Sequence, residues 1–234
     1  MPRLARVVVP GCPHHVTQRG NHRQRVFFND SERGRYLALL RKYFDRFKID
    51  TVGYDLMSNH VHHVLIPAMS DSLARGLGHL HNDFARWQQV QRDLTGHLWQ
   101  NRFFSCPLDE DHFWQALRYI ELNPVRAGLV RYPWEWPWSS AQAHVTGVDG
   151  TGLLNMDPWR ARFDGEKWRG FLEEGMRSED GLDRIRLATR TGRPLGSDLF
   201  IERLEALAGR TLRPKKRGPK RDSRNGRLPS FEVE

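Results

Sequence analysis

Apolar residues in the first half of the chain recur with the period of an α-helix in two places. In residues 31–47, and again from about Asp71 to Trp87, large apolar side chains lie three and four positions apart. Ser31 stands where the first of these helices would begin, and its hydroxyl can accept a hydrogen bond from a free backbone N–H of the first turn. We therefore predict two amphipathic helices here, and a third from about Asp111 to Leu122.

Short apolar or alternating segments between these helices predict strands instead. The predicted strands are 14–20, 50–57, 60–66 and 98–106. Ser58-Asn59 separates the two middle segments and is a plausible hairpin turn. The resulting order is strand, helix, strand, strand, helix, strand, with one more helix behind it. This order predicts an α+β fold in which a ferredoxin-like antiparallel sheet carries helices on one face.

The second half of the chain is predicted to be helical. A glycine-rich break at 147–152 separates it from the strands, and helical periodicity follows at 166–176, 180–190 and 197–209. Ser197 and Gly209 are the expected N-cap and C-cap of the last helix. We expect three parts: a domain over 1–147, a helical C-terminal region over 148–209 and an unfolded basic tail over 210–234.

The net charge of +9 is concentrated at the C-terminal end. Residues 210–227 contain nine basic residues and one acid, so this stretch carries +8 of the total. Blocks of like charge beside proline and glycine resist folding and commonly bind phosphate backbones, although such a tail can also serve only solubility. The charge distribution therefore favours a nucleic acid as partner.

The remaining composition points to the cytoplasm. No segment approaches the roughly 18 apolar residues of a membrane span, and the N-terminal apolar run is shorter than the roughly 7 residues of a secretory signal. Cys12 and Cys106 could form a single bridge, but two free thiols in a reducing compartment are expected.

Two histidines in the predicted strand 60–66 are candidates for metal binding. His60 and His62 share one face of the strand, while His63 points to the other. Imidazoles about 7 Å apart along a strand can converge on one ion, but two ligands are an incomplete site. Taken alone, such a pair is more often solvent-facing or hydrogen-bonded.

The predicted helix 111–122 separates one tyrosine from its apolar residues. At about 100° per residue, Tyr119 lies about 150° from the centre of the apolar stripe, and Asn123 follows one turn later on nearly the same line. This pattern favours an ordinary surface tyrosine. If the helix crosses the histidine-bearing face of the sheet, however, Asn123 becomes a third ligand and the phenol of Tyr119 lies over the ion. The apolar stripe consists of Phe113, Trp114, Leu117 and Ile120.

Several segments resemble, in the same order, the Y1 transposase family of HUH single-strand DNA endonucleases. They are HHVTQRGNHRQRVFF, MSNHVHHVLIP, and YIELNPVRAGLV followed by WPWSSAQAH. Within the family they are most similar to the REP-associated tyrosine transposases, single-copy relatives of the IS200/IS605 transposases. The resemblance covers roughly residues 1–147 and extends more loosely through RTGRPLGSDLF to the basic tail.

The resemblance implies roles for these residues. It implies that His60 and His62 bind a divalent ion, Mg²⁺ or Mn²⁺, and that Tyr119 attacks the scissile phosphate. It also implies a polar metal ligand four positions after the tyrosine, which is glutamine in the IS200 transposases and the shorter Asn123 here. Gln18 on the first strand is an alternative or additional ligand.

The activity implied by the resemblance is to nick and rejoin single-stranded, hairpin-bearing (REP-like) DNA through a 5′-phosphotyrosine. No small-molecule substrate and no membrane is expected; the protein would act in the cytoplasm near the nucleoid, as a monomer or homodimer. The alternatives are a mobile IS200/IS605-type transposase, a non-catalytic DNA-binding regulator on the same fold, and a metal hydrolase without a covalent link. A covalent adduct at Tyr119 is expected only of the transposase-type enzymes.

Two groups of basic side chains are expected to contact DNA. The turn after the first strand is rich in hydrogen-bond donors, although it can equally be a solvated loop. The tail is expected to bind phosphates without sequence preference. The candidate residues are Arg19, His22, Arg23 and Arg25 in the turn, and Arg213, Lys215, Lys216 and Arg217 in the tail.

Overall fold

An antiparallel sheet forms the centre of the molecule. The computed structural model describes residues 6–93, 95–178 and 181–213. Four strands lie in the order β2-β3-β1-β4. Their bounds are β1 His14–Arg19, β2 Ile49–Leu56, β3 His60–Pro67 and β4 Phe104–Pro107. With the connectivity β1-α1-β2-β3-α2-β4, this strand order is the ferredoxin-like arrangement, so the predicted α+β class is confirmed.

The helices follow the predicted order along the chain. The longer ones are α1 Asp30–Phe47, α2 Ser72–Arg92, α3 Glu110–Glu121, α7 Gly165–Arg177, α8 Leu182–Thr191 and α9 Asp198–Ala208. Short helical turns connect them: η1 Asn21–Arg23, α4 Asn123–Arg126, η2 Pro133–Glu135, α5 Ala141–Thr146 and α6 Asp157–Arg160. No described helix has the length and apolar character to cross a membrane.

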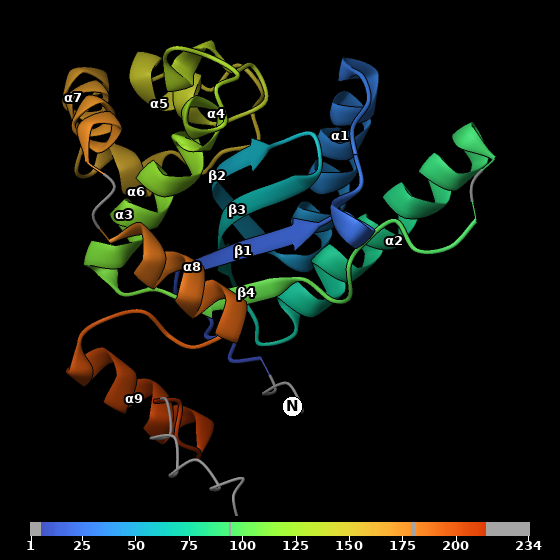
Figure 1. The fold of residues 1–234 in the computed structure, drawn as a ribbon. Coiled ribbons are helices and arrows are strands. Elements are labelled where there is room, and N and C mark those ends of the chain that lie inside the picture. The colour runs from blue at the N-terminus through green and yellow to red at the C-terminus, as the bar shows by residue number, and fades with distance from the viewer. Residues whose placement is uncertain (1–5, 94, 179–180, 214–234) are drawn as a thin grey trace, which may run out of the picture.

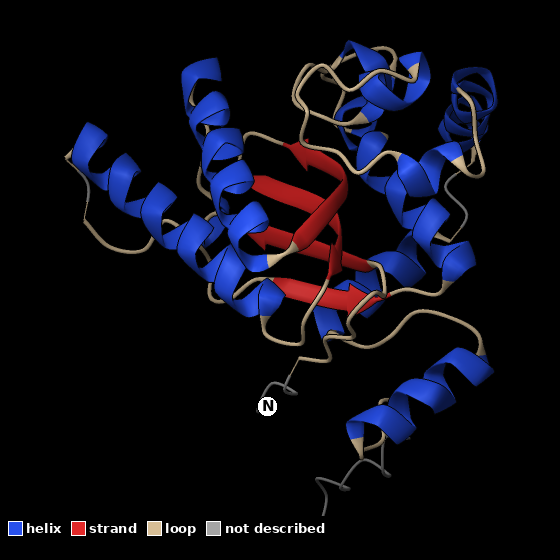
Figure 2. Cartoon of the chain, turned by 180° about the vertical axis from the view of Figure 1, so that it is seen from behind, coloured by secondary structure: helices blue, strands red, loops and turns tan. Residues whose placement is uncertain are grey.

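Helices cover both faces of the sheet. The pair α1 and α2 lies on one face, as predicted, and is seen in front of the strands in Figure 2. The opposite face is covered by α3 and α8. In Figure 1, α3 lies to the left of the strands and α8 lies in front of the start of β1. The strands require this second layer because their apolar residues point both ways: Val61 packs toward α1 and α2, and Val64 packs toward α3. The prediction of helices on one face therefore holds for α1 and α2 but not for the whole sheet.

Two predicted element ends differ in the structure. Asn29, not Ser31, is the N-cap of α1, and its side chain accepts a hydrogen bond from the Glu32 N–H at 3.0 Å. The last strand begins at Phe104 rather than at 98, because residues 98–101 turn across the end of β1, where the Gln100 N–H donates to the Arg19 carbonyl. The caps predicted for the last helix, Ser197 and Gly209, are confirmed.

The C-terminal region shares its core with the sheet. Trp168 and Leu172 of α7 and Ile185 and Ala188 of α8 belong to the same buried cluster as Val64. These described residues of α7 and α8 therefore extend the core that lies on the sheet. Both cysteines, Cys12 and Cys106, are free, as expected.

A buried carboxylate fixes the end of α3. Glu121 is fully buried, and its Oε1 accepts hydrogen bonds from Ser140 Oγ and His144 Nδ1, each at 2.6 Å. Its Oε2 accepts the Trp168 Nε1–H at 2.8 Å. A buried charged group is tolerated when its oxygens are hydrogen-bonded in this way. Because these partners come from α5, α7 and the segment before α5, they hold the residues around Tyr119 in place.

His14 is buried as a neutral side chain and should make the fold sensitive to acid. Its Nδ1–H donates to the Cys12 carbonyl at 2.7 Å and its Nε2 accepts the Val9 N–H at 3.3 Å, while burial lowers the pKa of His14 to about 4. The unfolded chain takes up a proton below its ordinary pKa of about 6.5, whereas the folded chain does not until about pH 4. Folding stability is therefore lost as the pH falls from about 6.5, at about 1.4 kcal/mol per pH unit.

Replacing this histidine should reduce the acid sensitivity. We expect His14→Gln to lose about 2 kcal/mol less of its free energy of unfolding than the wild type between pH 7 and pH 5. Urea unfolding at the two pH values measures this, and His79→Gln, at an exposed position, is the control. If the wild type and His14→Gln lose the same free energy of unfolding between pH 7 and pH 5, His14 is not responsible for the acid sensitivity.

Candidate active site

The two histidines of β3 lie next to each other at the edge of a buried face. Their ring centroids are 5.0 Å apart, with the planes at 82°. His60 Nδ1 is 2.6 Å from Asn59 Oδ1, an atom that can only accept, so this ring nitrogen donates. Burial lowers the pKa of His60 to about 3, with Arg19 as a further cause. The ring is therefore neutral near pH 7 and keeps the lone pair of its Nε2.

Helix α3 crosses this face and brings the tyrosine to the histidines. Asp109 caps the helix by accepting a hydrogen bond from the His112 N–H at 3.0 Å. The apolar side of α3 packs on β2 and β3. The Tyr119 ring meets the His62 ring edge-on at a centroid distance of 5.7 Å. Tyr119 is 8% exposed, so the surface tyrosine favoured by the helical periodicity is wrong. The reason is tertiary: α8 covers the side of α3 that carries Tyr119.

Asn123 joins the histidine pair to a buried carboxyl group. Its Nδ2 donates to Asp55 Oδ2 at 3.0 Å and lies 3.1 Å from His60 Nε2, which accepts. Asp55 is the register partner of His62 on the neighbouring strand. Burial raises the pKa of Asp55 to about 8, although the bond from Asn123 acts in the opposite direction. Asp55 Oδ1 is buried and has no hydrogen-bond partner among the described residues.

A chain of hydrogen bonds connects His62 to α8. His62 Nδ1 is 2.9 Å from His15 Nε2, and His15 Nδ1 is 2.7 Å from Thr189 Oγ1. The Thr189 hydroxyl donates to the Ile185 carbonyl at 2.8 Å, so its oxygen accepts from His15. Burial lowers the pKa of His15 to about 3, so His15 Nε2 carries no proton and accepts from His62 Nδ1–H. This chain leaves the lone pair of His62 on Nε2.

Three arginines surround Tyr119. The Arg126 guanidinium lies 4.5 Å from the centre of its ring and donates to its carbonyl at 2.6 Å. Arg186 of α8 is hydrogen-bonded to the tyrosine side chain, and this bond raises the pKa of Arg186. Burial and the charge of Arg23 lower the pKa of Arg19, while the nearby Tyr119 raises it. The site therefore offers several positive charges to an anionic group at the tyrosine.

The structure brings together most, but not all, of the predicted site residues. Tyr119, His60, His62 and Asn123 meet as described. Gln18 does not, because it pairs opposite Val61 and so points to the other face of the sheet, where its Nε2 donates to the Asn101 carbonyl at 3.0 Å. The prediction of Gln18 as a ligand of this site is therefore wrong.

The predicted DNA contacts divide in the same way. His22, Arg23 and Arg25 are exposed in the turn after β1, and Asn59 Nδ2 donates to the Arg23 carbonyl, which ties this turn to the hairpin beside His60. Their role stays a prediction.

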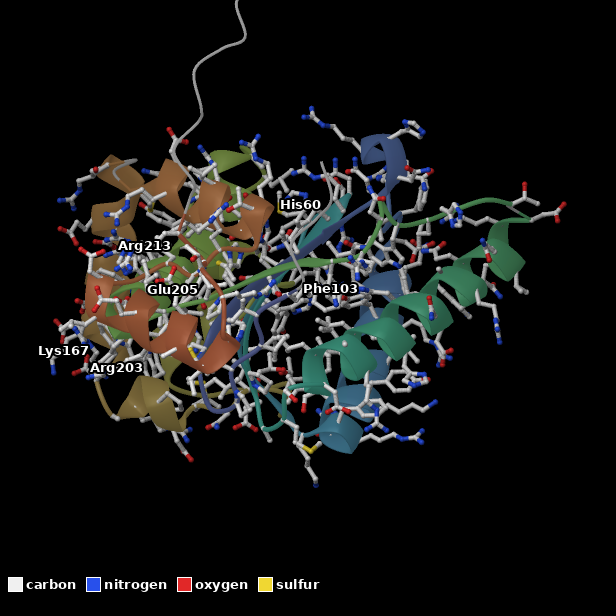
Figure 3. The ribbon with its side chains drawn as sticks, turned by 90° about the horizontal axis from the view of Figure 1, so that it is seen from below. His60, Phe103, Lys167, Arg203, Glu205 and Arg213 are labelled. Atoms are coloured by element: carbon white, nitrogen blue, oxygen red, sulfur yellow. The ribbon has the colours of Figure 1, made fainter. Side chains whose placement is uncertain are left out.

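Arg213 is engaged within the protein, since it forms ion pairs with Asp198, Glu202 and Glu205 at 3.1–3.2 Å. Figure 3 shows Arg213 beside Glu205 and away from His60. Its predicted role in DNA binding is thus not supported. The predicted tail residues Lys215, Lys216 and Arg217 lie outside the described residues.

The donor set fits a divalent cation that needs further ligands. The Nε2 atoms of His60 and His62 keep their lone pairs, and the amide of Asn123 would contribute its oxygen after a rotation that also turns Nδ2 away from His60. The unpartnered Oδ1 of Asp55 is a further oxygen beside this amide. Among the described residues, no group of three or more His, Cys, Asp or Glu side chains is arranged to hold a metal. The site therefore depends on the amide and on water or phosphate oxygens to complete it.

Sequence reasoning missed five residues of this site: Asp55, His15, Thr189, Arg126 and Arg186. For one of them a signal was present. A two-residue turn at Ser58-Asn59 sets Asp55 opposite His62 by counting outward from the turn, as observed. The two residues of α8 could not be found in this way, because nothing in the sequence states where that helix packs.

Comparisons with known proteins identify a family of similar sequences. Residues 8–123 match the family model described as "Transposase IS200 like". A REP-associated tyrosine transposase of Haemophilus influenzae is 26% identical over 112 residues, which are 43% of this chain and 64% of that protein. The chain thus spans less than two thirds of the length of this curated relative.

A solved structure agrees at the level of the fold. It is the structure of a REP-associated tyrosine transposase bound to a REP hairpin. Its superposition on this protein has a TM-score of 0.54 at 19% sequence identity, and it covers 64% of this chain and 90% of that chain. The family match ends at Asn123, so it includes the tyrosine and both histidines but not α8.

Proposed function

The chain belongs, through residues 8–123, to the IS200-like family of transposases, and on this premise we propose that it nicks and rejoins single-stranded DNA through a covalent bond to Tyr119. The observation that carries the proposal is the contact of the Tyr119 ring with His62, beside the His60–Asn123 pair. These residues come from separate segments of the chain, and each has the chemistry that a phosphoryl transfer to tyrosine needs.

The proposed reaction exchanges one phosphodiester bond for another. The Tyr119 oxygen forms a bond to the scissile phosphorus, the bond from phosphorus to the 3′ oxygen breaks, and the phenolic proton ends on the 3′-hydroxyl. The products are a 5′-phosphotyrosine and a free 3′-hydroxyl. Because the energy of the ester is retained in the protein link, the 3′-hydroxyl of a second strand can reverse the step.

The side chains around the tyrosine divide the remaining work. A divalent cation, Mg²⁺ or Mn²⁺, held by His60, His62 and Asn123, would draw negative charge from a non-bridging phosphate oxygen. Arg126 and Arg186 hold the tyrosine ring and its hydroxyl in place. Their positive charge also attracts the phosphate.

We further propose hairpin-bearing, REP-like single strands as the substrate. The relative in Haemophilus influenzae is named for such elements, and the related solved structure contains a REP hairpin. Arg19, His22, Arg23 and Arg25 are the proposed contacts beside the site, and the protein would act on nucleoid DNA in the cytoplasm.

Trapping of the covalent intermediate tests the proposed function. A hairpin oligonucleotide with single-stranded flanks and a label on the 5′-phosphate side of the cut should become attached to the protein, and peptide mapping should place the label on Tyr119. The adduct should form with Mg²⁺ and should not form in EDTA. It should form at least as well with Mn²⁺ as with Mg²⁺, because imidazole suits the softer ion. Adduct formation in EDTA, or clearly faster with Mg²⁺ than with Mn²⁺, would contradict the proposed metal site.

The competing functions give different results in the same experiment. A metal hydrolase would cut the oligonucleotide and leave no label on the protein. A non-catalytic DNA-binding regulator would bind the hairpin and neither cut nor label. A wild-type protein that binds the hairpin and forms no adduct in either ion therefore rejects the proposed function.

A further inference from the structure

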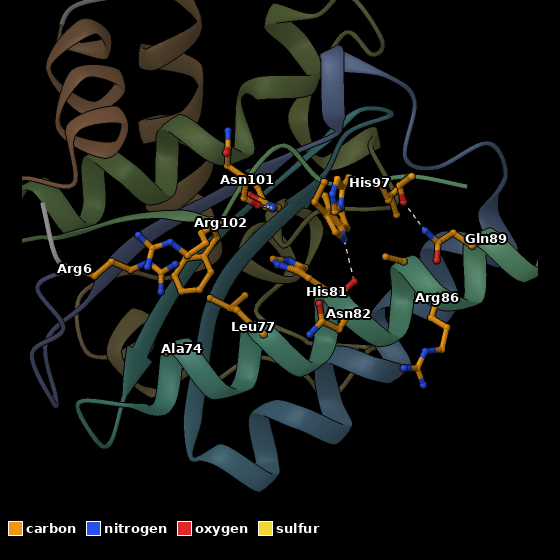
Figure 4. A pocket seen from close by; sticks show the side chains of 17 residues that line it. Arg6, Ala74, Leu77, His81, Asn82, Arg86, Gln89, His97, Asn101 and Arg102 are labelled. Atoms are coloured by element: carbon orange, nitrogen blue, oxygen red, sulfur yellow. Dashed lines mark hydrogen bonds between the residues drawn. The ribbon is translucent and has the colours of Figure 1, made fainter. Parts of the chain in front are cut away.

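A cavity of about 650 Å³ lies between α2 and residues 96–103, on the opposite face of the sheet from Tyr119. Figure 4 shows it with α2 as one wall and the segment before β4 as the other. Its volume is within the range of about 300–1,000 Å³ found for pockets that hold small ligands. None of the residues proposed for the tyrosine chemistry lines it.

A buried amide on the wall of this cavity lacks a partner. Gln18 is 2% exposed, and its Nε2 donates to the Asn101 carbonyl at 3.0 Å. Its Oε1 is buried with no hydrogen-bond partner among the described residues. An unpaired buried acceptor is unfavourable, so the wall is complementary to a ligand that donates a hydrogen bond. An amino group or ring N–H on the edge of a nucleobase is such a donor.

The charge of the cavity selects an anion. Among the residues that the structure describes, its lining contains Arg6, Arg86 and Arg102 and no aspartate or glutamate. Figure 4 shows Arg6 and Arg102 together on one side and His81 and His97 on the other. The Arg6 guanidinium lies 3.7 Å from the centre of the Phe103 ring. A nucleotide carries both groups, because its phosphate is anionic and its base carries hydrogen-bond donors. The phosphate would bind at the arginines and the base at Gln18.

The end of β1 lies between the cavity and the tyrosine. Gln18 and Arg19 are consecutive on this strand, so their side chains point to opposite faces. The charge of Arg19 acts on Tyr119 and His60, while Gln18 lines the cavity. The segment that forms the cavity wall is also tied to this end, since the Gln100 N–H donates to the Arg19 carbonyl at 2.8 Å. A strand that leaves the tyrosine can therefore reach the cavity by passing the end of the sheet.

We propose that this cavity binds one nucleotide of the single strand that flanks the cleavage point, with the base at Gln18 and a phosphate at Arg6 and Arg102. The proposal rests on the proposed function, since it assumes a single-stranded substrate. The cavity holds the flank while Tyr119 acts on the other face, and it thereby contributes to the choice of substrate. A free mononucleotide offers the same chemistry, so the experiment must separate it from a strand.

Arg102→Ala tests the proposal with little risk to folding, because Arg102 is exposed. The probes are a hairpin oligonucleotide with single-stranded flanks, the same hairpin without flanks, and dTMP. We expect Arg102→Ala to bind the flanked hairpin about tenfold more weakly and the flankless hairpin with unchanged affinity. Arg35→Ala, at an exposed position on α1 outside the cavity lining, is the matched control and should bind both as the wild type does.

A second measurement locates the strand without a variant. 5-Iodouracil placed at successive flank positions should cross-link on irradiation to the tryptic peptide that ends at Arg102, at one or two adjacent positions only. Cross-links confined to other peptides, or equal affinity of Arg102→Ala and wild type for the flanked hairpin, overturn the proposal. Displacement of the flanked hairpin by dTMP at similar concentration would assign the cavity to a mononucleotide and overturn it as well.

The outcomes also separate this proposal from the proposed function. A Tyr119 adduct in the wild type together with an unaffected Arg102→Ala rejects the cavity and keeps the tyrosine chemistry. Flank binding that depends on Arg102, with no adduct in any ion, supports the cavity and rejects the tyrosine chemistry.

Discussion

Tyr119→Phe is expected to abolish the covalent adduct with single-stranded DNA, a loss of at least about a thousandfold in its rate of formation. The substitution removes the hydroxyl oxygen and leaves the ring, which packs edge-on against His15 and His62 at centroid distances of 5.8 and 5.7 Å. The Arg126 guanidinium also keeps its place over the ring. The fold and the affinity for the hairpin should therefore stay close to those of the wild type, which a melting curve and a binding titration measure.

Tyr132→Phe is the matched control for this prediction. Tyr132 stacks on Trp134 at a centroid distance of 5.0 Å, in the segment after α4 and outside the site. It should form the adduct at the wild-type rate. Undiminished labelling of Tyr119→Phe would show that another residue is the nucleophile, and the assignment of Tyr119 would be withdrawn.

The second large effect is expected at Thr189, which touches neither the proposed cation nor the DNA. Thr189→Val removes the acceptor for His15 Nδ1–H, so the proton of His15 no longer has to lie on that nitrogen, and His62 loses the constraint that keeps its lone pair on Nε2. Loss of such an outer partner of a metal ligand commonly weakens metal binding by about 10–100-fold. We expect this reduction in Mn²⁺ affinity, together with a comparable reduction in the rate of adduct formation at limiting Mn²⁺.

Measurements on the metal-free protein distinguish positioning from a general structural effect. In the wild type, ¹⁵N NMR should find the His62 proton on Nδ1, whereas Thr189→Val should show a mixture of tautomers. Thr189→Ser retains the hydroxyl and should restore both the tautomer and the Mn²⁺ affinity. Thr191→Val is the control on the same helix, because the Thr191 hydroxyl also bonds the carbonyl four residues earlier, at 2.8 Å, but does not contact His15. If Thr189→Val shows the wild-type tautomer of His62 and the wild-type affinity for Mn²⁺, the proposed role of Thr189 in orienting His62 is refuted.

The elements that depend on local patterns were predictable from the sequence. The helices of residues 31–47 and 111–122 and the hairpin at Ser58-Asn59 agree with the structure to within a residue or two. Local pattern failed at 98–106, where the apolar residues 98 and 99 serve a turn across the end of β1 rather than a strand. Apolar character indicates burial, and this turn buries Trp99 as a strand would.

The identity of the site residues was likewise accessible in part. Strand alternation requires His60 and His62 to share a face, and helical spacing places Asn123 one turn after Tyr119. Gln18 shows the limit of this reasoning. Alternation on β1 puts it on the same face as His14 and Val16, but only the pairing of β1 with β3 decides that this is the face of Val61 and not of His62.

By itself, the sequence determined the elements, their order and the chemical groups at 60, 62, 119 and 123. Only the tertiary structure decided that α3 and α8 cover the histidine-bearing face, that Tyr119 is buried there against His62, and that hydrogen bonds through His15 connect Thr189 to His62. The physical reason is the range of the interactions. Periodicity reports which residues of one element share a side, whereas the face on which a distant helix packs depends on apolar surfaces that meet only when the chain has folded.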